Sequence, residues 1–370
     1  MRMVRSWWPL CVALAGAAAC ASSDAKRGAL TLESKLPVSF GQLSNVVELR
    51  DGRIVFADTR DRLFLRGDLK SGKLDTLGKR ADTLGAGAAP SLYKMPGWVA
   101  HLAGDTVALV DFAALRTTLW TETGQPVRAL LIPPAGGPTP VLAYDRAGFG
   151  YKADYQAVVG GGEPGRALRP DSVAVLRIEL GTGRVDTVAQ LAAPEYGDAT
   201  FGEQVQQVAK IFGPNDVFGV LPDGRVWVAR ARENRIDWRG PGGVWIRGES
   251  RKYTKVPVTQ ADKDRVIARI REQGKGRGLP DSLHLEWPFA ENKPPFETGT
   301  SDLVGQVWLQ RASDLDADEA VYDVYATDGS WKEAIAFPKG VSLAGFGSGG
   351  TIYAIIKNGD LKTVGRYKLQ

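Results

Sequence analysis

The feature that most constrains this chain is a glycine-containing turn followed by a short strand, a pair that recurs along its 370 residues. In the clearest copy, Asp223-Gly224 precedes the β-branched and aromatic run of Arg225–Arg230, the pattern of a turn leading into a strand. Aligning the copies predicts six strands, near residues 52–58, 105–111, 148–154, 224–230, 305–311 and 350–356. This recurrence indicates a repeat architecture, in which each unit packs against its neighbours.

One position of the repeat, three residues after the turn glycine, is mostly aromatic. Its occupants are Val55, Tyr151, Trp227, Trp308 and Tyr353, and the second copy has Ala108 in this column, four residues after Gly104. Large aromatic side chains in one column are expected to be buried between neighbouring sheets. In most copies a second and a third strand follow, separated by tight turns at glycines such as Gly72, Gly124 and Gly183. Each unit therefore predicts a small antiparallel sheet made of consecutive hairpins.

These patterns predict an all-β fold, a six-bladed β-propeller formed by residues 29–370. The last unit holds three strands only, whereas the first is preceded by an extra strand, Ala29–Leu36. We expect that strand to complete the last blade and close the ring, because closure removes exposed sheet edges. One helical insertion is predicted at about 257–275, where Thr259 and Asp262 form a helix-start motif, and we expect it to cap one face of the disc.

Two segments resemble a known repeat. In Ala57–Leu63 and Val110–Arg116 a strand ends in Asp and a short loop leads to Arg, which resembles the NHL-type repeat of bacterial six-bladed β-propeller proteins. Residues 229–236 keep an arginine but lack the aspartate. The resemblance implies an architecture for roughly residues 30–370 and no particular activity.

The first residues predict export. Arg2 and Arg5 precede an apolar run that is too short to span a bilayer, so residues 1–19 are interpreted as a signal peptide. Cys20 follows three alanines and resembles the lipobox of bacterial lipoproteins, although Ala17 stands where that motif usually has leucine. The resemblance implies acylation of Cys20, a lipidated tether over 20–28, and a periplasmic or outer-membrane lipoprotein of the cell envelope. Ordinary cleavage near these alanines, with Cys20 incidental, is the alternative.

Residues that commonly carry catalysis or bind metals are scarce. Both cysteines, Cys11 and Cys20, lie in the first twenty residues, so no cysteine-based site is possible in the fold. The two histidines, His101 and His284, exclude a histidine-rich metal cluster, and we interpret His101 as a hydrogen-bonded core residue. A net charge of +5 in a chain with 24% charged residues argues against nucleic acid as a partner. No residue is assigned a catalytic role.

The remaining candidates for a site are oxygen-bearing side chains at the expected starts of inner strands, which would surround the propeller axis. They are Asn45, Asn215, Asp216 and Asp302. Such oxygens suit a hard cation such as calcium. The expected arrangement resembles that of six-bladed lactonases, which bind a metal on the propeller axis. No cofactor is predicted, and calcium is the alternative.

The hypothesis that follows is a lipid-anchored, non-enzymatic binding or interaction scaffold of the bacterial cell envelope. It would contact the membrane through acylated Cys20 and present one face to an unidentified protein or small molecule. The alternative is a lactonase-like hydrolase with a metal on the propeller axis. A third hypothesis is sugar binding by exposed tryptophans such as Trp238 or Trp245.

Overall fold

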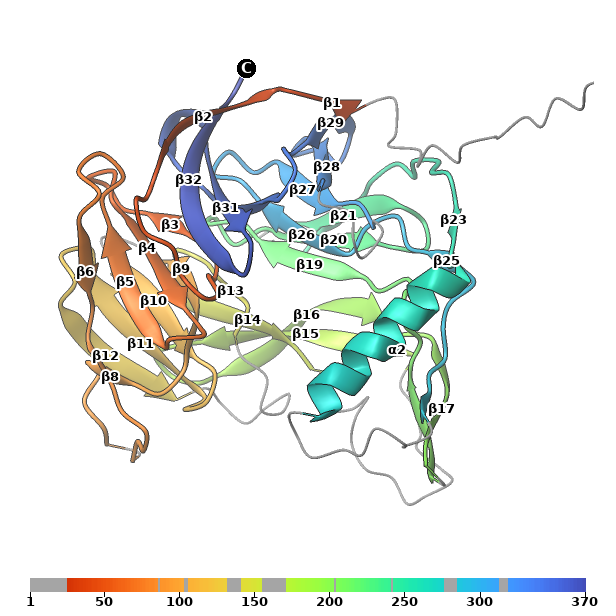
Figure 1. Cartoon of the computed structure of the whole chain (residues 1–370), viewed down its shortest axis with the longest axis horizontal. Coiled ribbons are helices and arrows are strands. Elements are labelled where there is room, and N and C mark those ends of the chain that lie inside the picture. Colours follow the sequence, from red (N-terminus) through yellow and green to blue (C-terminus); the bar gives the residue numbers. More distant parts are fainter. Residues whose placement is uncertain are drawn as a thin grey trace, which may run out of the picture.

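The computed structural model describes residues 25–85, 87–102, 106–131, 141–154, 171–202, 204–240, 242–275, 285–312 and 319–370. Within these residues the chain is mostly β-sheet, with one α-helix, α2 (Gln260–Lys275). Six of the sheets contain four or five strands each. Figure 1 shows these sheets following one another, in chain order, around the middle of the molecule.

We number the six sheets in chain order and list their strands from first to last. The first contains β3 (Val47–Glu48), β4 (Ile54–Asp58), β5 (Leu63–Gly67) and β6 (Leu74–Thr76); the second contains β9 (Pro96–His101), β10 (Thr106–Asp111), β11 (Arg116–Thr121) and β12 (Pro126–Leu131). The third contains β13 (Ala143–Tyr144), β14 (Phe149–Ala153), β15 (Ser172–Glu179) and β16 (Val185–Ala192); the fourth contains β19 (Val217–Val220), β20 (Val226–Arg230), β21 (Arg235–Arg239) and β22 (Trp245–Arg247).

The last two sheets also take in the start of the described chain. The fifth contains β26 (Thr298–Ser301), β27 (Val307–Gln310), β28 (Val321–Tyr325), β29 (Trp331–Ala336) and β1 (Ala25–Lys26); the sixth contains β30 (Val341–Phe346), β31 (Thr351–Asn358), β32 (Leu361–Leu369) and β2 (Leu30–Lys35). The shorter elements are β7 (Lys79–Arg80), β8 (Leu92–Tyr93), β17 (Tyr196–Phe201), β18 (Gln204–Ala209), β23 (Val256–Pro257), β24 (Leu285–Glu286), β25 (Asn292–Lys293) and the 3-10 turn η1 (Ser348–Gly350).

The repeat predicted from the sequence is confirmed strand by strand. The six repeated strands are β4, β10, β14, β20, β27 and β31, and each is the second strand of its sheet. The turn glycines before β20 and β27, Gly224 and Gly305, have φ values of 83° and 89°. A side chain is strained in that left-handed region, so the turn requires glycine.

The aromatic column is buried between sheets, as predicted. Trp227 and Tyr353 are fully buried, and Tyr151 is 1% exposed. Five hydrophobic clusters of the described core each combine residues of two consecutive sheets, and a sixth combines the first sheet with the sixth. Contacts between first strands follow the same order, since β9 lies between β3 and β13, and β30 contacts β3.

The N-terminal strand joins the end of the chain. β2 pairs antiparallel with β32, with Leu30 opposite Leu369 and Lys35 opposite Gly365, so it supplies the fourth strand of the sixth sheet as predicted. β1 pairs in parallel with β29, which the sequence did not predict. Of the tether expected over residues 20–28, Ala25 and Lys26 therefore belong to a sheet.

Buried carboxylates hold the ends of several strands. Asp58 accepts backbone hydrogen bonds from Gly41 and Gln42, and Asp111 accepts equivalent bonds from Lys94 and Met95. Both aspartates are fully buried. These are the aspartates of the two segments that resemble NHL repeats, so in this chain their task is to fasten loops.

In the fourth sheet the loop after the second strand is held by an aspartate that lies elsewhere in the chain. Arg230 stands where the first two sheets have aspartate, and Asp216, just before β19, accepts a hydrogen bond from Ala231 N at 3.0 Å. Asp216 also binds the Arg230 guanidinium at 2.8 Å. The missing aspartate of this repeat is thus replaced by one that precedes the sheet.

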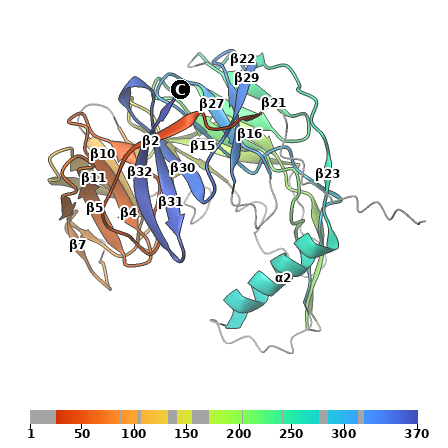
Figure 2. The same ribbon diagram turned by 45° about the horizontal axis from the view of Figure 1, so that its top comes forward.

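The two long insertions, one between β16 and β19 and the other between β22 and β26, form one substructure. The predicted helix begins after Thr259, whose Oγ1 accepts from Asp262 N while Asp262 Oδ2 accepts from Thr259 N, a reciprocal capping box. β17 of one insertion pairs with β24 of the other. Figure 2 shows α2 standing out from the sheets rather than covering their centre, so its expected place over one face of a disc was wrong.

A buried ion pair fixes the helix to β25, which lies later in the same insertion. Lys293 Nζ lies 3.1 Å from Asp262 Oδ1, and their side chains are 2% and 1% exposed. Burial alone would raise the pKa of Asp262, but hydrogen bonds from Thr259, Lys293 and Arg265 outweigh it and hold the pKa well below its usual range.

Candidate functional site

The four candidates for an axial site do not assemble into one. Asn45 is committed to the second sheet, because its Nδ2 donates to Val99 O at 2.6 Å and its Oδ1 accepts from Val99 N at 3.0 Å. Asp216 uses both oxygens to bind Ala192 N, Arg230 and Ala231 N. Both residues therefore connect neighbouring segments of backbone, and their oxygens are already engaged.

The other two candidates lie apart. Asn215 is exposed and precedes β19. Asp302 follows β26 instead of preceding it, and its carboxylate accepts from Val304 N, Gln306 N and the Trp308 indole in the hairpin turn. Asn215 therefore precedes the first strand of its sheet, whereas Asp302 follows the first strand of its sheet. The predicted start of β26 was wrong.

The donor set around the axis does not fit a calcium site. A calcium ion takes six to eight oxygen ligands, and in two of the four candidates, Asn45 and Asp216, every side-chain oxygen already accepts a hydrogen bond from a backbone amide. Among the described residues, no three His, Cys, Asp or Glu side chains gather closely enough to bind a metal. We therefore assign no chemistry to a metal on the axis.

The exposure of the histidine and tryptophan residues named in the sequence analysis differs in part from what we expected. His101 is exposed at the end of β9, with Nε2 3.1 Å from Glu122 Oε1, so it is not a core histidine. Trp238 is 3% exposed and packs in the core, whereas Trp245 is 40% exposed. Cys20 and His284 lie outside the described residues.

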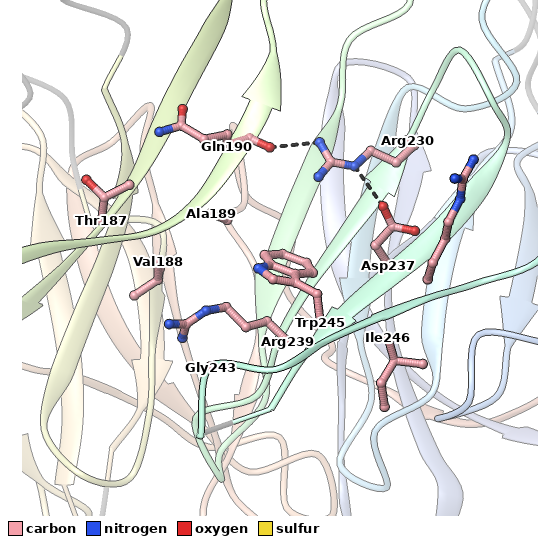
Figure 3. A pocket seen from close by; sticks show the side chains of 11 residues that line it. Thr187, Val188, Ala189, Gln190, Arg230, Asp237, Arg239, Gly243, Trp245 and Ile246 are labelled. Carbon is pink, nitrogen blue, oxygen red and sulfur yellow. Dashed lines mark hydrogen bonds and ion pairs between the residues drawn. The ribbon is translucent and has the colours of Figure 1, made fainter.

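The described chain forms a cavity of about 540 Å³ between the outer strands of the third and fourth sheets. Its walls are β16 on one side and β21 and β22 on the other (Figure 3). This volume lies within the roughly 300–1,000 Å³ of small-molecule sites. The lining residues are Thr187, Val188, Ala189, Gln190, Arg230, Asp237, Arg239, Gly243, Trp245, Ile246 and Arg247.

The wall formed by β16 is irregular at the cavity. Ala189 pairs with Val175 and Thr187 pairs with Leu176, so Val188 is an extra residue, a β-bulge. Bulges re-aim side chains and are frequent next to active sites. The bulge makes the side-chain alternation along this edge strand irregular where it borders the cavity.

A network of charges crosses from one wall to the other. Arg230 donates to Gln190 O on β16 at 2.7 Å and to Asp237 Oδ2 at 3.1 Å, as Figure 3 shows. Burial would raise the pKa of Asp237, but hydrogen bonds from Arg235 and Arg230 lower it. Asp237 is therefore ionised at neutral pH.

Two further arginines line the cavity without such partners. Among the described residues, the side chains of Arg239 and Arg247 make no hydrogen bond or ion pair, although those of Arg177, Arg230 and Arg235 nearby are each bound to an aspartate. Arg239 extends from β21 toward β16 in Figure 3. The lining holds three arginines and one aspartate and so carries a net charge of +2.

The sequence analysis named Trp245 and missed the rest of this cavity. Its residues come from two different repeats, about 50 positions apart, and all except Gly243 lie in strands. The available signal was the density of arginine in Arg230–Arg247 together with an exposed tryptophan.

Sequence comparisons find no match: no family model and no curated protein matches this chain. Solved structures do resemble its fold. A member of the DUF4221 family from Bacteroides vulgatus has a TM-score of 0.50 and 10% identity, with 92% of this chain and 98% of that one covered. A gluconolactonase from Xanthomonas campestris has a TM-score of 0.45 and 13% identity, covering 90% and 91%. Virginiamycin B lyase from Staphylococcus aureus has a TM-score of 0.44 and 11% identity, covering 92% and 99%.

These neighbours are β-propellers, and at such low identity they show the fold alone. They include enzymes, a gluconolactonase and a lyase. The expectation of a non-enzymatic scaffold is corrected on this finding. That expectation rested on the scarcity of histidine and cysteine, but general acid–base catalysis does not require either residue type.

Proposed function

We propose that the protein is an exported, six-bladed β-propeller hydrolase of lactonase-like type, which opens a lactone or simple ester in the cavity between β16 and β22. The observation that carries the proposal is the composition of that cavity. An ionised carboxylate, Asp237, shares it with Arg239 and Arg247, two guanidinium groups that have no carboxylate partner among the described residues.

The chemistry required is modest. Water adds to the carbonyl carbon and loses a proton, the bond to the ring oxygen breaks, and that oxygen takes up a proton to give a hydroxy acid. Asp237 Oδ1 accepts one hydrogen bond, from Arg235 Nε, and would accept a second from the attacking water and so orient it. Because its pKa is lowered, it is a weak base, and the proton passes on to solvent.

The arginines supply the second requirement, which is stabilisation of negative charge. The tetrahedral intermediate carries an oxyanion, and donors placed before the reaction lower its energy by about 3–4 kcal/mol each in well-built sites. Arg239 and Arg247 would act on this oxyanion and on the carboxylate product. Trp245 would hold the ring against the wall formed by β22.

Six blades and a closed ring are part of the proposal. The support is that six core clusters link consecutive sheets, including the first with the sixth. The pairing of β2 with β32 supports closure by the N-terminal strand.

For the cellular location we propose a lipoprotein of the envelope, anchored through acylated Cys20. Among the described residues no helix has the length and apolarity needed to cross a bilayer. Cys20→Ser is expected to release the protein from membranes, and a variant that stays in the membrane fraction contradicts the anchor.

A lactone panel followed in a pH-stat tests the hydrolase. Wild-type protein should open at least one five- or six-membered lactone or hydrolyse 4-nitrophenyl acetate, and Asp237→Asn should lower kcat by about 10²-fold. The control is Asp75→Asn, which removes another arginine-bound carboxylate, on β6 of the first sheet and outside the cavity lining. Absence of turnover, or equal loss in both variants, overturns the proposal.

A second variant guards against misfolding of Asp237→Asn, which removes one of the two aspartates bound to Arg230 and the aspartate bound to Arg235. Arg239→Gln breaks no ion pair among the described residues, so its thermal unfolding should match that of wild type. Its activity should nevertheless fall, because the oxyanion loses a donor.

A further inference from the structure

We infer that the cavity between β16 and β22 recognises an organic anion with a flat ring, a carboxylate-bearing aromatic or planar heterocycle. This inference names the substrate or product class for the proposed hydrolase site. It concerns binding at equilibrium, so it can be tested whether or not the protein turns over an ester.

The first argument is charge. A cavity with a net charge of +2 concentrates anions, since low-dielectric walls focus the field of its charged groups. Buried and half-buried arginines nearby are bound to aspartates at 2.6 to 3.2 Å, as Arg177, Arg230 and Arg235 show. Arg239, which is half-buried, has no such partner among the described residues, and neither does Arg247, which is exposed on the adjacent strand.

The second argument is geometry. β21 and β22 pair with Asp237 opposite Arg247 and Arg239 opposite Trp245. Residues paired directly across an antiparallel sheet place their side chains on the same face. Asp237 and Arg247, two positions from Arg239 and Trp245 along their strands, share that face, so both arginines and the indole border one cavity.

The third argument is the exposed indole. Trp245 is 40% exposed between Val244 and Ile246, which are 71% and 61% exposed. An exposed tryptophan beside guanidinium groups suits a ring that stacks on the indole while its carboxylate binds arginine bidentately. A bare anion such as phosphate would use the arginines alone.

Isothermal titration calorimetry with benzoate tests the inference, and benzamide is the neutral ligand of the same shape. Benzoate should bind wild-type protein at least tenfold more tightly than benzamide does. Inorganic phosphate should bind more weakly than benzoate, since it cannot stack. Raising the salt concentration should weaken benzoate binding, because the charges are partly exposed.

Variants then locate the site. Arg239→Gln and Trp245→Ala should each weaken benzoate binding at least tenfold. The matched control is Arg128→Gln, an exposed arginine on β12, the outer strand of the second sheet. Equal binding of benzoate and benzamide, absence of benzoate binding, or an equal effect of Arg128→Gln overturns the inference.

The outcomes separate this inference from the proposed function. Benzoate binding that depends on Arg239, without turnover of any ester, supports anion recognition and removes the hydrolase. Turnover of lactones without benzoate binding supports the hydrolase and removes the recognition of a planar organic anion.

Discussion

Replacing Asp111 tests whether buried carboxylates hold the ends of the repeated strands. Asp111 is fully buried, and its carboxylate accepts from Lys94 N at 2.6 Å, Met95 N at 3.0 Å and Ala114 N at 3.1 Å. In Asp111→Ala all three amides lose their acceptor. Each unsatisfied buried donor costs about 1–3 kcal/mol. Because water can enter and satisfy part of the set, we expect a loss of about 3–5 kcal/mol in the free energy of unfolding.

Urea unfolding followed by tryptophan fluorescence measures this loss, and thermal unfolding gives a second readout. Asp111→Asn keeps one acceptor oxygen but no charge, so its stability should fall between wild type and Asp111→Ala. Asp328→Ala is the matched control, because Asp328 binds only the neighbouring Ser330 in an exposed hairpin turn. If Asp111→Ala is no less stable than this control, the reasoning about strand ends is refuted.

Three further predictions concern stability and pH. Trp227→Ala empties a fully buried site in the core between the fourth and fifth sheets and should cost about 3–5 kcal/mol in urea unfolding, and a loss below 1 kcal/mol would contradict that packing. Deleting residues 25–35 exposes the edges of β29 and β32 and should lower the melting temperature, so unchanged melting would refute the role of β1 and β2. The depressed pKa of Asp262 means that its contribution is fully present above its unfolded value of about 3.9 and is lost as pH falls through the folded value. The urea midpoint of Asp262→Asn should therefore vary less between pH 5 and pH 2 than that of wild type, and parallel curves would contradict the assignment.

The repeated strands could be predicted because each carries its own local signal. Asp223-Gly224 before Val226–Arg230 fixes both the turn and the strand, and Gly224 adopts the positive φ that the turn requires. The same holds for the helix, whose start at Thr259 is encoded in a capping box. Such features depend on residues within a few positions of one another.

Features that depend on distant residues were missed. Asp216 takes over the task of an aspartate absent after β20, which no local pattern reveals. Asp302 was assigned to the wrong end of its strand, because a turn aspartate before a strand resembles one after it. The cavity was missed for the same reason, since the walls formed by Gln190 and Trp245 meet only when two sheets pack.

The most direct test of the central claim is a steric block of the cavity. Thr187 is exposed and lines the wall formed by β16. Thr187→Tyr therefore adds bulk to the cavity while Asp237 and the arginines keep their own side chains. We predict that this variant melts like wild type but loses lactone opening and benzoate binding, whereas Asn215→Ala near the axis keeps both. Full activity in Thr187→Tyr together with its loss in Asn215→Ala would contradict the account and move the site to the axis.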